Sequence, residues 1–240
     1  MTAALGVSAA LTLMLYLIPN GELVVLPLVW LSTLAHELGH GLTAVALGGH
    51  FGHLEIYMDA SGVAYTDNEG VLADALVSAG GLVGPSLVAA ACFLAARSPK
   101  ASRAALSFAS AFLLAVAAIW VRNVFGVVYV VGLAFVLVTV VVRLKAEGAR
   151  FVTAFLGVQL SLSVFSRSDY LFVPVAQTQA GPMPSDVARI AEVLWLPYWV
   201  WGGLCGLFSL VVLGGGLWLA VWGASPAPEE LPATLPRGTR

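Results

Sequence analysis

Charged side chains are scarce in this sequence: they make up 10% of its 240 residues, against about 25% in soluble proteins. With 11 Lys and Arg residues and a formal net charge of −2, the chain lacks the basic surface that binds nucleic acid. Its two cysteines, Cys92 and Cys205, lack the close paired spacing of a zinc knuckle or a redox CxxC motif. These scarcities exclude a soluble globular domain and a nucleic-acid partner.

Apolar residues take the place of the missing charge and make up 60% of the sequence. A helix needs about 20 of them to cross a bilayer, because each residue rises about 1.5 Å and backbone polar groups cannot stay unpaired in lipid. The candidate segments are residues 5–18, 23–47, 71–96, 104–121, 124–142, 151–165 and 193–222. Two of them are short, so the sequence predicts an all-α polytopic membrane protein with six or seven transmembrane helices.

Two polar intervals interrupt this pattern. In residues 51–66, β-prone runs flank Asp59-Ala60-Ser61-Gly62, which predicts a short β-hairpin after the second helix. The segment after Trp222 contains four prolines and few apolar residues, which is typical of a disordered tail. The predicted organisation is therefore one integral membrane domain, residues 1–223, and a disordered Pro-rich C-terminal tail, residues 224–240.

Basic residues flank the paired segments 104–121 and 124–142 at their outer ends. These residues are Arg97, Lys100, Arg103, Arg143, Lys145 and Arg150. The positive-inside rule places both clusters in the cytoplasm, and two crossings between them satisfy it. A single crossing by residues 71–96 then places the predicted hairpin on the opposite side of the membrane.

An HExxH motif, His36-Glu37-Leu38-Gly39-His40, lies inside the apolar segment 23–47. Residues four apart in a helix share one face, with Cβ atoms about 5–6 Å apart, so His36 and His40 suit two ligands of one metal ion. Glu37 is placed to act as the general base on a zinc-bound water, which the metal acidifies. Polar residues in a membrane helix are costly and indicate function; a polar packing cluster is the alternative.

The surroundings of this motif resemble the site-2 protease family of intramembrane zinc metallopeptidases. The resemblance rests on HELGH in an early membrane helix, the hairpin after it, and Ala79-Gly80-Gly81-Leu82-Val83-Gly84-Pro85 in the next helix. Ser168-Asp169-Tyr170 and Ser185-Asp186-Val187 stand where a compact branch that lacks a PDZ domain has an aspartate and a Ser-Asp turn. The resemblance covers residues 23–213 and implies one Zn²⁺ per chain.

The same resemblance implies that the hairpin faces the cytoplasm, which conflicts with the count of basic residues. Both can hold if residues 71–96 break at Gly80-Gly81 or Gly84-Pro85 and re-enter the membrane. The sequence leaves these two orientations of the hairpin open.

The third zinc ligand has two candidates. The Leu-Asp-Gly and Asn-Pro-Asp-Gly motifs that supply it in other family members are absent. Asp169 adjoins the apolar segment 151–165, where a carboxylate needs a partner, so it is the favoured ligand. Asp186 is the alternative, although a carboxylate at a helix start is the simpler explanation for it.

These observations predict a zinc metalloendopeptidase, with Glu37 as its catalytic residue, that hydrolyses a peptide bond in or near the bilayer. Its expected partners are a membrane-protein or membrane-associated peptide substrate and the lipid bilayer, and its expected location is the plasma membrane of a bacterium.

The alternative is a non-catalytic membrane protein, derived from a protease, that binds or transports a metal. Glu37 argues against it, because ligands alone do not require that carboxylate. The sequence specifies no oligomeric state.

Overall fold

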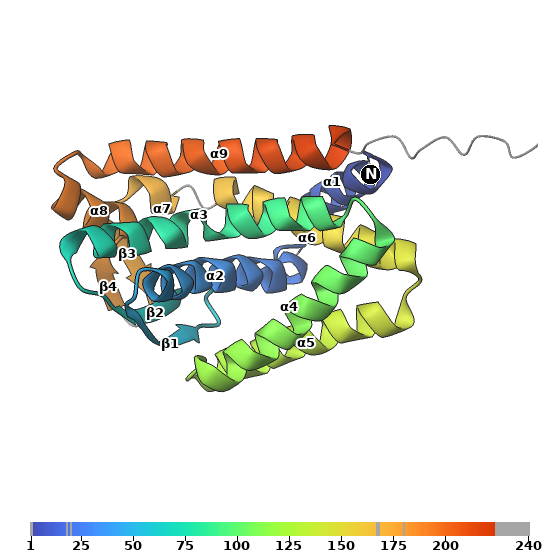
Figure 1. The fold of residues 1–240 in the computed structure, drawn as a ribbon, viewed down its shortest axis with the longest axis horizontal. Coiled ribbons are helices and arrows are strands. Elements are labelled where there is room, and N and C mark those ends of the chain that lie inside the picture. Colours follow the sequence, from blue (N-terminus) through green and yellow to red (C-terminus); the bar gives the residue numbers. More distant parts are fainter. Residues whose placement is uncertain (1, 18, 20, 167–168, 180, 224–240) are drawn as a thin grey trace, which may run out of the picture.

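Helices form most of the protein in a computed structural model, which describes all residues except 1, 18, 20, 167–168, 180 and 224–240. The helices are α1 (Thr2–Leu17), α2 (Gly21–Ala46), α3 (Val71–Ala95), α4 (Pro99–Ile119), α5 (Val124–Arg143), α6 (Ala146–Ser166), α7 (Asp169–Phe172), α8 (Asp186–Leu194) and α9 (Tyr198–Trp222). Two antiparallel hairpins pair β1 (His50–Ile56) with β2 (Gly62–Asp67), and β3 (Val175–Thr178) with β4 (Gly181–Pro184). The predicted helical fold and its hairpin are confirmed (Figure 1). The predicted tail lies outside the described residues.

Four helices of the described part of the chain, α3, α4, α5 and α9, are long and apolar enough to cross a membrane. Two further long helices, α2 with 26 residues and α6 with 21, pack against α3. Every predicted apolar segment therefore contains a helix, and the protein is a polytopic membrane protein. The count of six or seven crossings stays a prediction.

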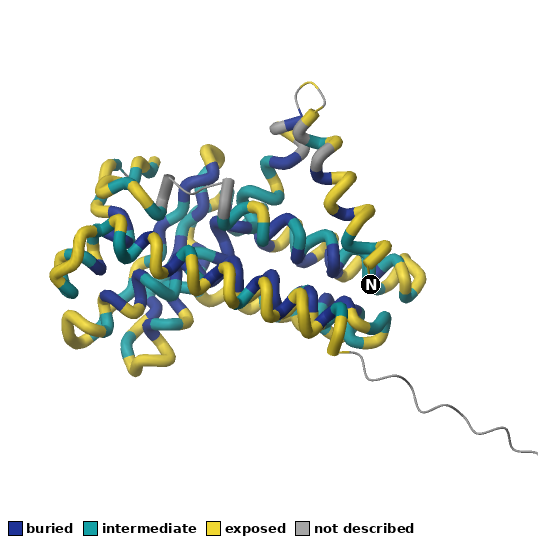
Figure 2. Tube along the Cα trace, turned by 90° about the horizontal axis from the view of Figure 1, so that it is seen from above, coloured by how far each residue is buried: buried dark blue, intermediate teal, exposed yellow. Residues whose placement is uncertain are grey.

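The helices expose many large apolar side chains, as expected for a protein surrounded by lipid, and bury several hydroxyl groups between them. Val124 is 82% exposed and Phe135 is 72% exposed, whereas Ser110 is buried, and exposed residues follow the outer faces of the helices in Figure 2. The Ser110 hydroxyl donates a hydrogen bond of 2.8 Å to the carbonyl of Ala134, which joins α4 to α5. Bonds of this kind hold membrane helices together, because lipid provides no hydrophobic drive between them.

Capping and proline, rather than hydropathy, set the helix boundaries. The hydroxyl oxygen of Ser98 accepts a hydrogen bond of 3.1 Å from the N–H of Ala101, so α4 begins at Pro99 and not at residue 104. α6 begins at Ala146 and not at 151. The predicted segment 193–222 is divided, because Pro197 separates the end of α8 from the start of α9.

α3 is continuous from Val71 to Ala95, although Pro85 lies inside it. A re-entrant break at Gly80-Gly81 or Gly84-Pro85, which would have reconciled the two predicted orientations, is therefore wrong. The glycines serve close packing instead: a Cβ added to Gly39 of α2 would meet the backbone of Gly80. A Cβ added to Gly84 would lie 2.6 Å from the carbonyl oxygen of Ala35. Small residues thus bring α2 and α3 together backbone against backbone.

The first hairpin is fixed to the turn between α4 and α5. The N–H of Leu54 in β1 donates to the Trp120 carbonyl at 2.9 Å, and the N–H of Arg122 donates to the Leu54 carbonyl at 3.2 Å. The side chain of Asn123 bonds both the N–H and the carbonyl of Ile56. These bonds occupy the outer edge of β1, and the opposite edge of the hairpin is that of β2. Both hairpins lie at the same end of the helices (Figure 1).

Candidate metal centre

His36 and His40 lie on one face of α2, one helical turn apart, as their spacing predicts. Their rings stand nearly perpendicular, at 88°, with centroids 4.7 Å apart. Their Nε2 atoms are 3.1 Å apart and point to a common location. The helix alone therefore supplies two imidazole nitrogens to one small site.

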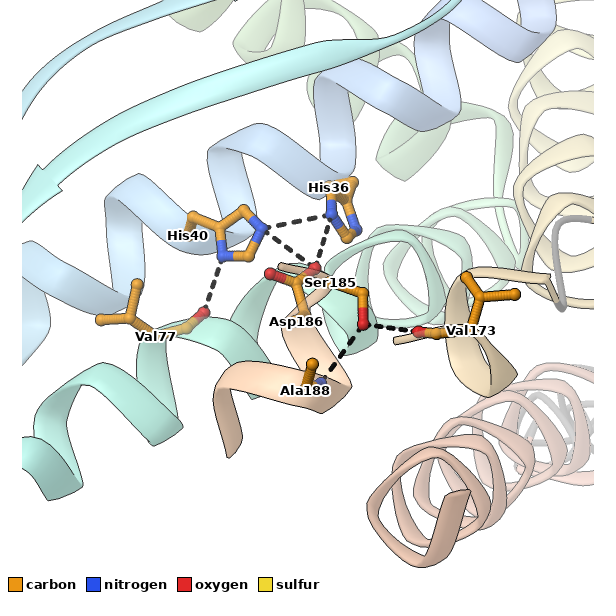
Figure 3. Close-up of polar contacts among 7 residues, drawn as sticks. All are labelled: His36, His40, Val77, Val173, Ser185, Asp186 and Ala188. Atoms are coloured by element: carbon orange, nitrogen blue, oxygen red, sulfur yellow. Dashed lines mark hydrogen bonds and ion pairs between the residues drawn. The ribbon is translucent and has the colours of Figure 1, made fainter. Parts of the chain in front are cut away.

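Asp186, the first residue of α8, completes this cluster from across the bundle (Figure 3). Its Oδ2 atom lies 3.1 Å from Nε2 of His36 and 3.4 Å from Nε2 of His40. Within the described residues, these three side chains form the group that could hold a metal ion, with ligand atoms all within 4.8 Å of one another. Burial alone would raise the pKa of the Asp186 carboxyl, but the neighbouring His40 and His36 hold that pKa below its usual range.

Ser185 leaves the Asp186 carboxylate available for the site. The Ser185 hydroxyl oxygen accepts a hydrogen bond of 3.2 Å from the N–H of Ala188 and so caps α8. The same hydroxyl donates a bond of 2.6 Å to the carbonyl of Val173. Asp186 is therefore not the cap of the helix, and its side chain points at the histidines instead.

His40 is held in one orientation by α3. Its Nδ1 atom lies 2.9 Å from the carbonyl oxygen of Val77. A carbonyl can only accept, so this bond places the imidazole proton on Nδ1 and leaves the lone pair on Nε2 facing the cluster. Gly81 makes room for the ring, because a Cβ at that position would overlap it. Both features match the orienting contacts that metal-binding histidines usually have.

Glu37 lies beside the cluster and is buried, with 5% of its surface exposed. Strand β2 packs on it directly: a Cβ added to Gly62 would lie 2.8 Å from both Cγ and Oε1 of Glu37. The backbone amide of Ala64 faces its carboxyl group. Glu37 and the three clustered side chains all line one cavity of about 470 Å³, which β2, β3, α3 and α8 also border.

Among the described side chains, the third member of the cluster is Asp186, the alternative third ligand. Asp169 begins α7, but its side chain lies outside the described part of the structure. The physical reason for Asp186 is tertiary: α8 packs on α3, which in turn packs on α2. The two other histidines, His50 and His53, lie on β1, where the His53 ring stacks on Tyr65 at 4.1 Å.

Sequence reasoning missed the second hairpin, which forms another wall of the cavity through Ala176, Thr178 and Met183. Gly181, with φ of 114°, was a turn signal that could have indicated it. Pro182 and Pro184 argued against a strand, since proline is confined to edges of sheets. A two-stranded hairpin consists of edges only, so the prolines are tolerated here.

The fold and the cluster define a polytopic membrane protein with a candidate metal site among its helices. Residues 7–216 match the family model described as Peptidase M50B-like, which covers well over half of the chain. The chain belongs to this family, which is that of the site-2 proteases, and the resemblance predicted from the sequence is confirmed. No curated protein and no solved structure matches the chain significantly.

Proposed function

We propose that the protein is a zinc-dependent endopeptidase that hydrolyses a peptide bond in or near the bilayer. The observation that carries the proposal is the convergence of His36, His40 and Asp186 beside the buried carboxyl of Glu37. Membership in a peptidase family supports it. Two imidazole nitrogens and one carboxylate oxygen are a donor set of catalytic zinc sites, which keep a fourth position open.

The three side chains fit one Zn²⁺ per chain. Their donor atoms already face one another at 3.1–3.4 Å, and the carbonyl of Val77 orients the His40 ring for binding through Nε2. We therefore assign His36, His40 and Asp186 as ligands. Zinc in such a site lowers the pKa of a water molecule towards about 7 and polarises a carbonyl group.

Glu37 is the general base in this proposal. It follows His36 directly in α2, so its carboxyl group reaches the cavity beside the ligands without being one of them. A carboxylate in this position accepts the proton of the attacking water and delivers it to the departing amine. A protein that only bound or transported the metal would have no use for this group.

The outer edge of β2, which faces the cavity, supports a peptide as the substrate. Leu54 and Ala64 are partners in the hairpin register, and the N–H and carbonyl of Leu54 point away from β2. In an antiparallel pair, those of Ala64 then point to the opposite edge, toward Glu37. An extended peptide that adds to this edge would place a backbone carbonyl beside the cluster. The expected substrates are membrane proteins or membrane-associated peptides, and the expected location is the plasma membrane of a bacterium.

The test compares Glu37→Gln with wild-type protein, both purified in detergent and reconstituted with a tagged single-span membrane protein. Wild type should contain about one zinc per chain and cleave the test protein, whereas Glu37→Gln should keep zinc and lose cleavage, because an amide cannot accept the proton. Glu147→Gln, an exposed change in α6, is the matched control and should behave as wild type.

Three results would contradict the proposal. Loss of zinc in Glu37→Gln would make Glu37 a ligand. Zinc binding without cleavage by wild type, across several single-span proteins, would favour the metal-binding alternative. Purified wild-type protein that contains no zinc would show that the three side chains do not form a zinc site.

A further inference from the structure

The cavity beside the metal centre continues deeper into the helix bundle. Val77, whose carbonyl oxygen contacts His40, lines the cavity, and so does Pro85, eight residues further along α3. Eight residues span roughly 12 Å of helix, so the cavity extends past the level of His40. We call this part of the cavity the deep lobe. Its lining residues are Ser32, Leu82, Pro85, Ser163, Val164 and Ser209.

Ser209 of α9 lies about level with Val83 of α3. The two helices pack together and run in the same direction (Figure 1). A Cβ added to Gly216 would lie 2.7 Å from Cβ of Ala90, so these two residues face each other. Ser209 precedes Gly216 by seven residues, and Val83 precedes Ala90 by the same number, which is about two helical turns.

The packing of α2 on α3 brings His36 to the same level. The two helices run in opposite directions, and a Cβ added to Gly84 would lie 2.6 Å from the carbonyl oxygen of Ala35. Val83 precedes Gly84, and His36 follows Ala35, so these two residues are about level. Ser209 therefore borders the cavity at the depth of His36, within the reach of a side chain held at the metal centre.

Two hydroxyl groups of the deep lobe have already used their protons. The Ser163 hydroxyl donates a hydrogen bond of 2.7 Å to the carbonyl of Leu160. The Ser32 hydroxyl donates one of 2.7 Å to the Ser163 oxygen. Each oxygen keeps a lone pair, so toward a ligand in the lobe both serines are acceptors.

The third hydroxyl group, that of Ser209, is buried and unpaired. Ser209 is 1% exposed and lines the cavity, yet its hydroxyl makes no hydrogen bond to any residue that the structure describes. It can both donate and accept. A buried polar group without a partner is costly, and most such groups in proteins are paired. The hydroxyl of Ser209 therefore indicates that a polar group occupies the lobe in the working protein.

We propose that the deep lobe binds the substrate side chain next to the scissile bond and prefers uncharged side chains that carry a hydroxyl or carboxamide group. This inference rests on the proposed function. Such a group donates a hydrogen bond to Ser32 or Ser163 and pairs with Ser209, whereas an apolar side chain leaves Ser209 unpaired. A charged side chain is excluded, because the described lining residues of the lobe provide no opposite charge. Ser209 is thus a specificity-determining residue.

The test varies the two residues that flank the scissile bond of the single-span test protein. Thr is compared with Val, and Gln with Met, because the members of each pair are similar in size and differ in hydrogen bonding. At one of the two positions, wild type should cleave the Thr and Gln substrates with a kcat/KM roughly tenfold above that of their apolar partners, since an unpaired buried hydroxyl is penalised. Glu in place of Gln should be cleaved least. Equal rates within both pairs at both positions, preference for the apolar members, or cleavage of Glu as fast as Gln would overturn the proposal.

Ser209→Ala should keep zinc and lose most of this preference, because an apolar side chain in the lobe then leaves no hydroxyl unpaired. The matched control is Ser110→Ala, which removes a buried hydroxyl between α4 and α5 that does not line the cavity. The control should retain the preference of wild type. A preference that persists in Ser209→Ala, or disappears equally in Ser110→Ala, would refute the role of Ser209.

Thiol labelling tests the deep lobe without any cleavage. In detergent, Ser209→Cys should react with a small water-soluble methanethiosulfonate faster than Ser110→Cys does. The unsubstituted chain, with its free cysteines Cys92 and Cys205, is the blank. Equal reactivity of the two variants would show that the lobe does not reach position 209 and would overturn the proposal.

The two sets of measurements separate this proposal from the proposed function. A chain that cleaves its test protein without the expected preference refutes the role of the deep lobe alone. A chain that cleaves no test protein but reacts at position 209 refutes the peptidase and leaves an open polar lobe beside the metal centre.

Discussion

Gly81→Ala should weaken zinc binding without any change in a ligand. A Cβ at position 81 would lie 2.7 Å from Cδ2 of the His40 ring and still closer to its Nε2 and Cε1 atoms. The ring cannot retreat freely, because its Nδ1 atom is held 2.9 Å from the Val77 carbonyl. In the Gly81→Ala variant, either the Nε2 atom of His40 moves away from the other ligand atoms or α2 moves away from α3.

The magnitude follows from the cost of overpacking, which is about 1–3 kcal/mol for an added methyl group in a packed interior. If this cost falls on the zinc-bound geometry, zinc affinity drops roughly 5- to 150-fold, since each 1.4 kcal/mol is about a factor of ten. The matched control is Gly132→Ala in α5, where an added Cβ meets nothing within 4 Å. That change should leave zinc affinity unaltered and favour the helix by up to about 1 kcal/mol.

The assay is competition for zinc between detergent-purified protein and a chromophoric chelator, with thermal unfolding and circular dichroism measured in parallel. Circular dichroism separates a weaker site from a lost fold. Equal zinc affinity in Gly81→Ala and wild type, with helix content retained, would refute the inferred packing of α3 on His40.

The remaining predictions concern the ligands and the hairpin. His36→Ala should lose both zinc and cleavage, because two protein ligands rarely hold a catalytic zinc; full zinc occupancy would remove His36 from the site. Asp186→Ala should lose zinc while Asp169→Ala keeps it, as measured by metal content, and the opposite result would restore Asp169 as the third ligand. Asn123→Ala should loosen β1 and lower the free energy of unfolding by about 1–3 kcal/mol, because it leaves backbone groups of β1 without their partner; an unchanged unfolding midpoint would contradict this role.

Local features of the fold were predictable because their causes lie within short stretches of sequence. Apolar runs of sufficient length located the helices, and the Asp59-Ala60-Ser61-Gly62 turn located the first hairpin. Helix starts were less accurate, since hydropathy does not register a cap such as Ser98. The second hairpin was missed because its prolines oppose the usual strand pattern.

The sequence by itself determined the membrane class, the family resemblance and the pairing of His36 with His40, since residues four apart share a helix face whatever surrounds the helix. Only the tertiary structure decided what completes this pair. Asp169 and Asp186 are both carboxylates beside apolar segments, and of the two only the Asp186 side chain lies within the described part of the structure. Asp186 joins the histidines because α8 packs on α3, and α3 packs closely on α2 through Gly39, Gly80 and Gly84. Contacts between distant segments depend on how helices pack, and helix packing is a property of the whole bundle.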